Sequence, residues 1–211
     1  MPPFRIMPDC TQIAADPAEL RAGFAQCPVL VFEDVFDPAL LALLLRQAEQ
    51  AGFVHDVVDT LGTREVEAPQ RVGAALGLML GRHALLEWLE AVTGAVPLRA
   101  ISGRLAQTRT RAEDGLTWHD DLNDKRRQLA LVLNLSTAEF DGGQFELRRK
   151  GEAEPLFSYH HQRPGTLMVF GIGPTIEHRV TSLQSGGPRR VYAGWAMSEP
   201  VSADDPLARH P

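Results

Sequence analysis

Cysteine is scarce in this sequence, and positive charge is not in excess. Cys10 and Cys27 are the only cysteines among 211 residues, which is too few for a disulfide framework or a cysteine-rich zinc site. The net charge of −6 counts against a nucleic-acid partner, because such partners select a basic surface. No apolar run approaches the length of a membrane span, and the first residues lack the apolar core of a signal peptide. We therefore expect a cytoplasmic protein with no membrane partner and no nucleic-acid partner.

The bulk composition is that of an ordinary globular protein, with 44% hydrophobic and 23% charged residues. The length suits one domain with a sizeable core. The sequence pattern changes near residue 95, since helix signals dominate before it and short strand-like runs dominate after it. We expect a single domain over 1–211, made of a helix-rich supporting region (1–95), a β-rich core (96–198) and a C-terminal tail (199–211).

The first region carries clear helix signals. Asp37 is a typical N-cap, Pro38 suits the first helical position and Gly52 suits the helix stop. The apolar residues that follow the N-cap recur at helical spacing and mark a buried face: Leu40, Leu41, Leu44, Leu45 and Ala48. A second helical region runs from Gln70 to Thr93, and Gly81 divides it into two helices.

The second region consists of short runs separated by turn residues. The predicted strands are "PLRAISGRLAQTR", "LTWHD", "RQLALVLNL", "GQFELRR", "PLFSYHH", "GTLMVFGI", "HRVTSL" and "RRVYAGWAMS". Connections such as "DGG" and "QSGGP" are rich in residues that favour turns, and Gly142 and Gly143 indicate a hairpin turn. No helix-length segment lies between the strands, so the pattern favours a sandwich or jelly roll over a parallel sheet. The expected fold class is α+β, mainly β.

The stretch "LTWHDDLNDKRRQ" places a histidine and two acids before an apolar run. Alternate side chains of a strand share a face, so His119 and Asp121 point together and Asp120 points away. A metal site, a catalytic carboxylate pair and a solvated turn are all compatible with this triplet. "DKRR", Asp124 to Arg127, is typical of a solvated loop, although contact with an acidic substrate is the alternative.

A third ligand is available in His178, which opens a strand at the mouth of the β-rich core. Together with His119 and Asp121 it gives two imidazoles and one carboxylate, the facial triad of non-haem Fe(II) sites. The other histidines are expected at the surface, on a rim or without an acid at metal spacing: His55, His83, His160, His161 and His210.

An arginine follows His178 on what looks like a hairpin partner strand, "RRVYAGWAMS". An arginine directed into an apolar barrel is costly unless an anion binds it. A dicarboxylate is a suitable partner, because guanidinium and carboxylate pair through two parallel hydrogen bonds. Arg189 and Arg190 are both candidates at this stage.

The order of these motifs resembles the Fe(II)/2-oxoglutarate-dependent dioxygenases, and most of all their prolyl-4-hydroxylase-like branch. The resemblance rests on His119-x-Asp121, then "DGGQFELR", "GTLMVF" and "HRVTSLQSGGPRR", and covers roughly 98–197. It implies a double-stranded β-helix, a distorted jelly roll, with an N-terminal supporting helical layer. It also implies that His119, Asp121 and His178 bind iron and are the catalytic centre.

The family pattern of Gly-x-Arg, with an aromatic residue six positions after the arginine, selects between the two arginines. Gly187, Arg189 and Trp195 match it, so the resemblance implies that Arg189 binds the distal carboxylate of 2-oxoglutarate. Arg190 falls on the opposite strand face and is the alternative. Trp118 and Trp195 are compatible with either the core or the lining of a pocket.

The resemblance implies an oxidoreductase that uses Fe(II), 2-oxoglutarate and O2, with ascorbate as an optional reductant. Decarboxylation of 2-oxoglutarate to succinate would be coupled to hydroxylation of a C–H bond in an amino acid, a peptidyl residue such as proline, or a small metabolite. Desaturation and ring formation are alternative outcomes. "LALVLNL" lacks the tyrosine that some prolyl hydroxylases use for 2-oxoglutarate, which counts against peptidyl proline.

Two other functions are compatible with the same residues. One is a cupin-like metalloenzyme that does not use 2-oxoglutarate, and the other is a non-catalytic binding module on the same fold. The segments expected to select a small-molecule or peptide substrate are "HDVVDTLGTREVEAPQ", interpreted as a lid, and "TRTRAEDG". The sequence contains no indication of the oligomeric state.

Overall fold

The computed structural model describes residues 1–58, 61–111 and 114–200. Its helices are α1 (Ala18–Gln26), α2 (Pro38–Gln50), α3 (Val72–Leu80) and α4 (His83–Thr93). Its strands before residue 95 are β1 (Phe4–Ile6), β2 (Thr11–Ile13), β3 (Val29–Phe32), β4 (Phe53–Val58) and β5 (Gly62–Glu67). The later strands are β6 (Ala100–Thr108), β7 (Leu116–His119), β8 (Arg127–Asn134), β9 (Phe140–Gly142), β10 (Phe145–Arg149), β11 (Phe157–Tyr159), β12 (Leu167–Gly171), β13 (Ile176–Val180), β14 (Leu183–Gly186) and β15 (Arg189–Met197).

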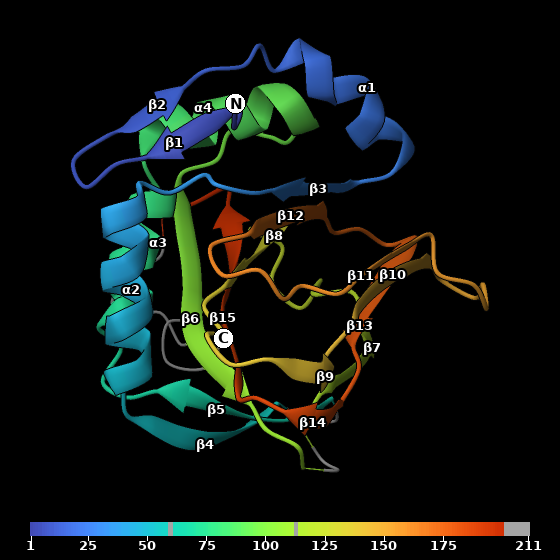
Figure 1. Ribbon diagram of the computed structural model, residues 1–211. Coiled ribbons are helices and arrows are strands. Elements are labelled where there is room, and N and C mark those ends of the chain that lie inside the picture. Colours follow the sequence, from blue (N-terminus) through green and yellow to red (C-terminus); the bar gives the residue numbers. More distant parts are fainter. Residues whose placement is uncertain (59–60, 112–113, 201–211) are drawn as a thin grey trace.

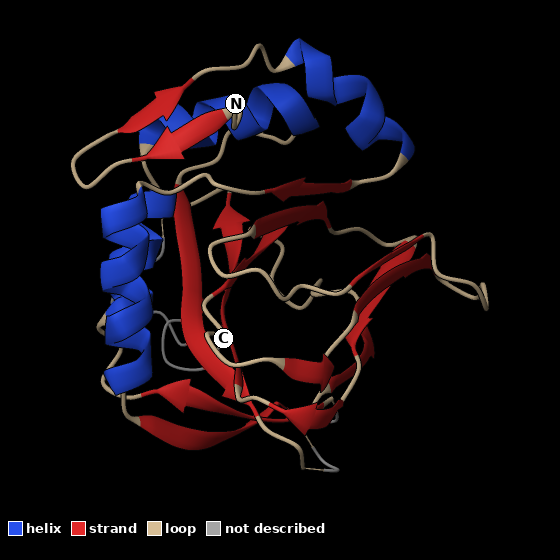
Figure 2. Ribbon diagram, in the orientation of Figure 1, coloured by secondary structure: helices blue, strands red, loops and turns tan. Residues whose placement is uncertain are grey.

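Two antiparallel sheets dominate the fold. The major sheet has seven strands in the order β3-β12-β8-β15-β6-β5-β4, and the minor sheet has four in the order β11-β10-β13-β7. The pair β9–β14 lies beside the minor sheet, and helices α2 and α3 cover the outer side of the major sheet (Figures 1 and 2). The space between the two sheets is therefore reached by side chains from both of them.

Helix α2 begins where the sequence predicts and ends at Gln50, two residues before the expected stop at Gly52. The Asp37 carboxylate accepts hydrogen bonds from the backbone N–H groups of Ala39 and Leu40, so it caps α2. Leu40, Leu44 and Ala48 are the buried residues of this helix, whereas the two other predicted core positions, at 41 and 45, are only partly buried. No helix among the described residues is long and apolar enough to cross a membrane.

The second helical region is divided as expected. Gly81 ends α3, and the next helix begins at His83. Gly94 takes a left-handed conformation, with φ of 73°, and ends α4. The helices pack on one side of the major sheet in a large apolar core that includes Leu76, Leu89 and residues of strands β8 and β15.

A smaller apolar cluster fills part of the space between the sheets. It contains Ala130, Phe145, Leu147, Met168 and Phe170. Because the two clusters lie on opposite sides of the major sheet, the alternation along each strand decides which core a side chain joins. The cluster between the sheets holds the functional site.

The segment interpreted as a lid is instead a hairpin of the major sheet. Strands β4 and β5 pair with each other, and β5 also pairs with β6. Arg64 binds the carboxylate of Asp56 at 2.9 Å, so charged residues of this hairpin are paired across strands and do not mark a loop. Residues 59 and 60, and two residues of "TRTRAEDG" (112 and 113), lie outside the described residues.

Other local differences concern short elements. The sequence prediction missed α1, β1, β2 and β9. The predicted strand "HRVTSL" is divided, since β13 pairs with β10 and β7 while β14 pairs with β9. Strands of three or four residues carry too few alternations for a periodic signal.

Candidate metal centre

Neighbouring strands of the minor sheet bring two predicted ligands together. His119 is the last residue of β7, and His178 stands directly opposite it on β13. Their ring centroids are 4.2 Å apart. Residues that are 59 positions apart in the sequence thus become cross-strand neighbours because the two strands pair antiparallel.

Asp121 completes this group, although not by strand alternation. Strand β7 ends at His119, and Asp121 has a left-handed backbone with φ of 60°. This turn directs its carboxylate back to the histidines. Oδ1 lies 3.7 Å from Nε2 of His119, and Oδ2 lies 3.4 Å from Nε2 of His178. The prediction that a shared strand face orients Asp121 was therefore wrong in its mechanism, while the three side chains do converge.

The chemistry of these donors fits a divalent metal ion. One ligand atom from each of His119, Asp121 and His178 can be chosen so that all three lie within 4.8 Å of one another. Nδ1 of His119 lies 2.7 Å from the carbonyl oxygen of Thr117. If Nδ1 carries the proton and donates it to this carbonyl, Nε2 is left unprotonated and able to bind a metal. Two imidazoles and one carboxylate are the donors that suit non-haem Fe(II).

The surroundings of His178 favour its metal-binding form. Burial lowers the pKa of His178 to about 4, with Asp121 opposing and His119 reinforcing that change. Phe145 and Phe170 pack against its ring, with centroids 5.9 Å and 4.7 Å away. His178 is therefore neutral near pH 7, as a metal ligand must be.

The two acids of "WHDD" have different roles. Asp121 accepts a hydrogen bond from Nε1 of Trp195 at 2.9 Å. Asp120 accepts from Lys150 and from the backbone N–H of Leu122. The bond from Lys150 is the largest cause that holds the pKa of Asp120 below its usual value. Asp120 thus stabilises the turn, and Asp121 faces the histidines.

Arg189 reaches the same cavity from the major sheet. Its side chain is buried, and no residue in the described part of the chain accepts a hydrogen bond from its Nε. Burial lowers the pKa of Arg189 to about 10, so it remains charged at pH 7. Gly143, with φ of 62°, leaves room for this side chain, because a Cβ there would lie 2.9 Å from Cδ of Arg189.

Arg190 is directed differently. Its Nε donates to Oε1 of Gln107 at 2.9 Å, and its guanidinium carbon lies 5.9 Å from the ring centroid of Phe53. It does not line the cavity that contains the three candidate ligands. The geometry therefore separates the two arginines as strand alternation predicts.

The cavity between the sheets has a volume of about 420 Å³, within the range of small-molecule sites. It is lined by the three candidate metal ligands, by Arg189 and Trp195, and by residues of the β4–β5 hairpin. Trp195 is thus a pocket residue. Trp118 does not line it, because its ring packs against the guanidinium groups of Arg148 and Arg179.

Three further residues were misjudged from the sequence. Arg127, in the supposedly solvated "DKRR", has a side chain that is only 4% exposed and lines the cavity. Asp124, in the same segment, is also buried. His161, expected on a rim, is fully buried, and burial followed by the charge of Arg189 lowers its pKa to about 4.

Of the remaining histidines, His83 and His160 are exposed, as expected for a surface and a rim residue, and His55 is exposed on β4. His210 lies outside the described residues, as does most of the predicted tail, 201–211.

Comparison with known proteins finds one family that the site region resembles. Residues 105–197 match the model of the family described as the 2OG-Fe(II) oxygenase superfamily. The comparison with curated proteins gives no match. The matched segment runs from within β6 to the end of β15 and contains all three candidate ligands and Arg189.

Solved structures share the fold at low sequence identity. An oxidoreductase of the 2OG-Fe(II) oxygenase family from Burkholderia pseudomallei has a TM-score of 0.64 and 15% identity, covering 88% of this chain and 92% of its own. A prolyl-4-hydroxylase from Pseudomonas putida has a TM-score of 0.62 and 18% identity, covering 87% and 99%. The epimerase SnoN in complex with Fe3+, alpha ketoglutarate and nogalamycin RO has a TM-score of 0.60 and 15% identity, covering 86% and 84%.

These findings confirm the expected fold class, a mainly β double-stranded β-helix with a helical layer. The resemblance is supported over residues 105–197, which match the model of the 2OG-Fe(II) oxygenase superfamily, and the solved structures that share the fold include a prolyl-4-hydroxylase. The donor set of His119, Asp121 and His178 suits Fe(II), and the solved structure of SnoN contains Fe3+ and alpha ketoglutarate.

Proposed function

With a 2OG-Fe(II) oxygenase core as the premise, we propose that His119, Asp121 and His178 bind Fe(II) and that Arg189 binds the distal carboxylate of 2-oxoglutarate. The protein then couples oxidative decarboxylation of 2-oxoglutarate to the hydroxylation of a C–H bond. The substrate is an amino acid, a peptidyl residue or another small molecule. We also propose that 96–198 is the catalytic part of a single domain and 1–95 its supporting part.

The buried charge of Arg189 carries this proposal. A guanidinium in an apolar cavity costs several kcal/mol unless an anion pairs with it, and Nε of Arg189 has no acceptor among the described residues. A dicarboxylate that reaches from the histidine pair to Arg189 would supply the missing partner. A cupin-like metalloenzyme without 2-oxoglutarate would leave this charge unexplained.

The residues around the site have separate tasks in this function. Bound Fe(II) and 2-oxoglutarate supply the oxidising chemistry, and the protein supplies their orientation. Trp195 fixes one carboxylate oxygen of Asp121 through its indole N–H, and the carbonyl of Thr117 fixes the ring of His119. Phe145 and Phe170 exclude water from the side of His178.

The first experiment is anaerobic absorption spectroscopy of the full chain with Fe(II) and then 2-oxoglutarate. We expect a weak visible charge-transfer band in the native protein and none in Asp121→Ala. His178→Ala should form no succinate above background. An unchanged band in Asp121→Ala, or full succinate formation in His178→Ala, would contradict the ligand assignment.

The arginine assignment has a matched pair of variants. Arg189→Met should weaken 2-oxoglutarate binding by about 30-fold or more, because one partner of a buried charge pair is lost. Arg190→Met changes the next residue, on the opposite strand face, and should leave this affinity within about threefold. Equal effects of the two variants, or an effect of Arg190→Met alone, would refute Arg189 as the anchor.

A further inference from the structure

Arg127 lies on the wall of the cavity because of an irregularity in β8. The residues of β8 that pack between the sheets are Ala130 and Val132, so strict alternation would direct Arg127 toward the helices. The pairing of β8 with β15 shifts between Ala196 and Met197, where Leu129 and Arg127 are successive partners. The extra residue is Gln128, and it returns Arg127 to the cavity face.

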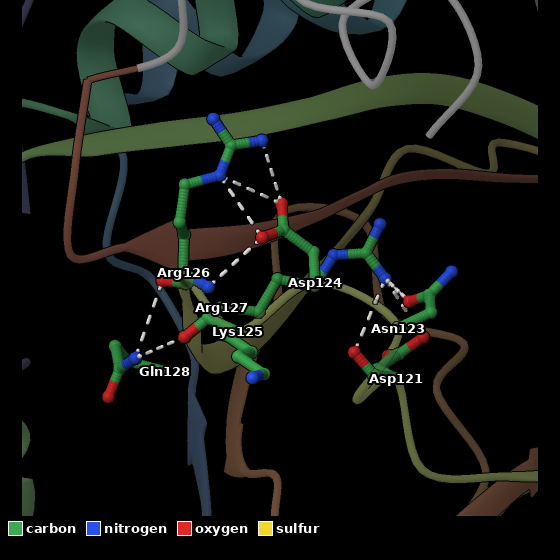
Figure 3. Close-up of polar contacts among 7 residues, drawn as sticks. All are labelled: Asp121, Asn123, Asp124, Lys125, Arg126, Arg127 and Gln128. Carbon is green, nitrogen blue, oxygen red and sulfur yellow. Dashed lines mark hydrogen bonds and ion pairs between the residues drawn. The ribbon is translucent and has the colours of Figure 1, made fainter.

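The guanidinium of Arg127 is held in a fixed position. Its central carbon lies 3.6 Å from the ring centroid of Trp195, and Nη1 donates to Oδ1 of Asn123 at 2.6 Å. Nη1 also lies 3.7 Å from Oδ1 of Asp121. Figure 3 shows how the two neighbouring arginines separate, with Arg126 on Asp124 and Arg127 on Asn123 and Asp121. Nε of Arg127 is buried without an acceptor among the described residues.

The charges on the cavity wall do not balance once the cofactors are bound. The described lining residues include the guanidiniums of Arg64, Arg127 and Arg189 and the carboxylates of Asp56 and Asp121. Asp56 pairs with Arg64. If Asp121 binds iron and Arg189 binds 2-oxoglutarate, Arg127 keeps no carboxylate of its own on this wall.

The nearest other acid does not change this result. Asp124 is hydrogen-bonded by the guanidinium of Arg126 through both carboxylate oxygens, at 3.0 and 3.2 Å from Nε and 2.9 Å from Nη2. Its charge reaches Arg127 only through space. A buried cation with a fixed fork and a free donor is suited to a planar anion, and a carboxylate is the common one in small molecules.

We propose that Arg127 binds a carboxylate of the substrate, so that the substrate is a small carboxylic acid. This inference rests on the proposed function, because it assigns Asp121 to the metal. Val57, Val58 and Leu61 line the same cavity, so the body of the acid is aliphatic. Since Arg127 lies beside Asp121, a carboxylate bound there holds the neighbouring carbon atoms close to the metal position.

The test compares acids with their uncharged analogues. The probes are hexanoate, 4-methylpentanoate and L-leucine, each paired with its carboxamide. Binding is measured by calorimetry to the full chain loaded with Ni(II) and saturated with 2-oxoglutarate, and succinate release is then measured with Fe(II). We expect at least one acid to bind about tenfold or more tightly than its amide, the strength of one charge-assisted hydrogen bond.

Variants at Arg127 and at the nearby Lys125 test which residue causes the preference for the acid over its amide. Arg127→Gln should abolish the preference for the acid, and Arg127→Lys should retain part of it, because the charge remains without the planar fork. Lys125→Gln removes an exposed positive charge two residues away and should keep the full preference. The affinity for 2-oxoglutarate should stay within about threefold in all of these variants.

Three results would overturn the proposal. They are equal binding of every acid and its amide by the native protein, an unchanged preference in Arg127→Gln, and equal losses of acid and 2-oxoglutarate affinity in that variant. The last result would assign Arg127 to the cosubstrate or to Asp121. Failure of the native protein to bind 2-oxoglutarate would instead refute the proposed function, and that measurement is made first.

Discussion

The two faces of the major sheet differ in how they treat buried polar groups. On β15, Tyr192 and Ala196 face the helices and belong to the large apolar core. Arg189 and Trp195, on the same strand, face the cavity. One strand thus separates a core built for stability from a cavity built for binding, through alternation alone.

Buried charges on the two faces have different partners. On the helix side, the carboxylate of Glu67 accepts from the backbone N–H groups of Val72 and Gly73 at the start of α3, both at 2.8 Å. On the cavity side, Nε of Arg127 and Nε of Arg189 have no acceptor among the described residues. Unpaired donors that converge on one cavity indicate a ligand, whereas paired ones indicate structure.

The largest effect on stability is expected from a substitution that changes only the helix side of the major sheet. Leu76→Ala removes a fully buried side chain of α3 and should lower the free energy of unfolding by about 2–5 kcal/mol. The affinity of the folded protein for Fe(II) should not change, because no cavity residue is altered. Denaturant unfolding and metal titration measure the two quantities.

Leu78→Ala is the matched control. Leu78 lies on the same helix and is 79% exposed, so its loss should change stability by no more than about 0.5 kcal/mol. A large loss of iron affinity in Leu76→Ala at a temperature where the variant is folded would show that the two faces are coupled.

A smaller effect is expected from His161, on the cavity side. Burial, followed by the charge of Arg189, lowers its pKa from 6.5 to about 4. Between these values the unfolded chain binds a proton that the folded protein does not, so stability falls as the pH falls from 6.5 toward 4. His161→Gln should reduce this slope by up to about 1.4 kcal/mol per pH unit. Chemical denaturation of the metal-free protein at a series of pH values measures it.

His160→Gln is the control for this prediction, because His160 is the exposed neighbour. It should leave the slope unchanged. An equal slope in the native protein and in His161→Gln would mean that His161 does not stay neutral in the folded state.

Much of this architecture follows from local sequence signals. Asp37 and Pro38 fix the start of α2, Gly81 ends α3 and Gly94 ends α4. The three predicted metal ligands also converge in the structure. They could be selected from the sequence because the resemblance depends on an ordered set of motifs and not on one triplet. Such signals are readable because they lie within a few residues of one another.

The unpredicted features depend on contacts between distant segments. The burial of Arg127 requires a bulge against β15, and that of His161 requires the turn before β12, where its Nε2 lies 2.7 Å from the carbonyl oxygen of Thr166. The β4–β5 hairpin is stabilised by pairing with β6. From the sequence, these places were interpreted as a solvated loop, a rim and a lid. The local sequence shows the polar side chains but not the distant strands with which they pack.

The smallest effect on stability is expected for Tyr192. It is the most direct test of the difference between the two faces, because its hydroxyl is an unpaired polar group on the helix side. The hydroxyl of Tyr192 is buried without a partner among the described residues, and burial raises its pKa. Gly77 and Gly103 pack closely against this side chain, since an added Cβ would lie 3.3 Å from the hydroxyl oxygen at Gly77 and 2.7 Å from Cζ at Gly103. Tyr192→Phe should therefore stabilise the protein by up to about 1 kcal/mol and leave 2-oxoglutarate binding unchanged. Thermal unfolding with and without 2-oxoglutarate measures both. A loss of stability above about 1 kcal/mol would show that the hydroxyl is paired in solution, and that unpaired donors do not distinguish the two faces.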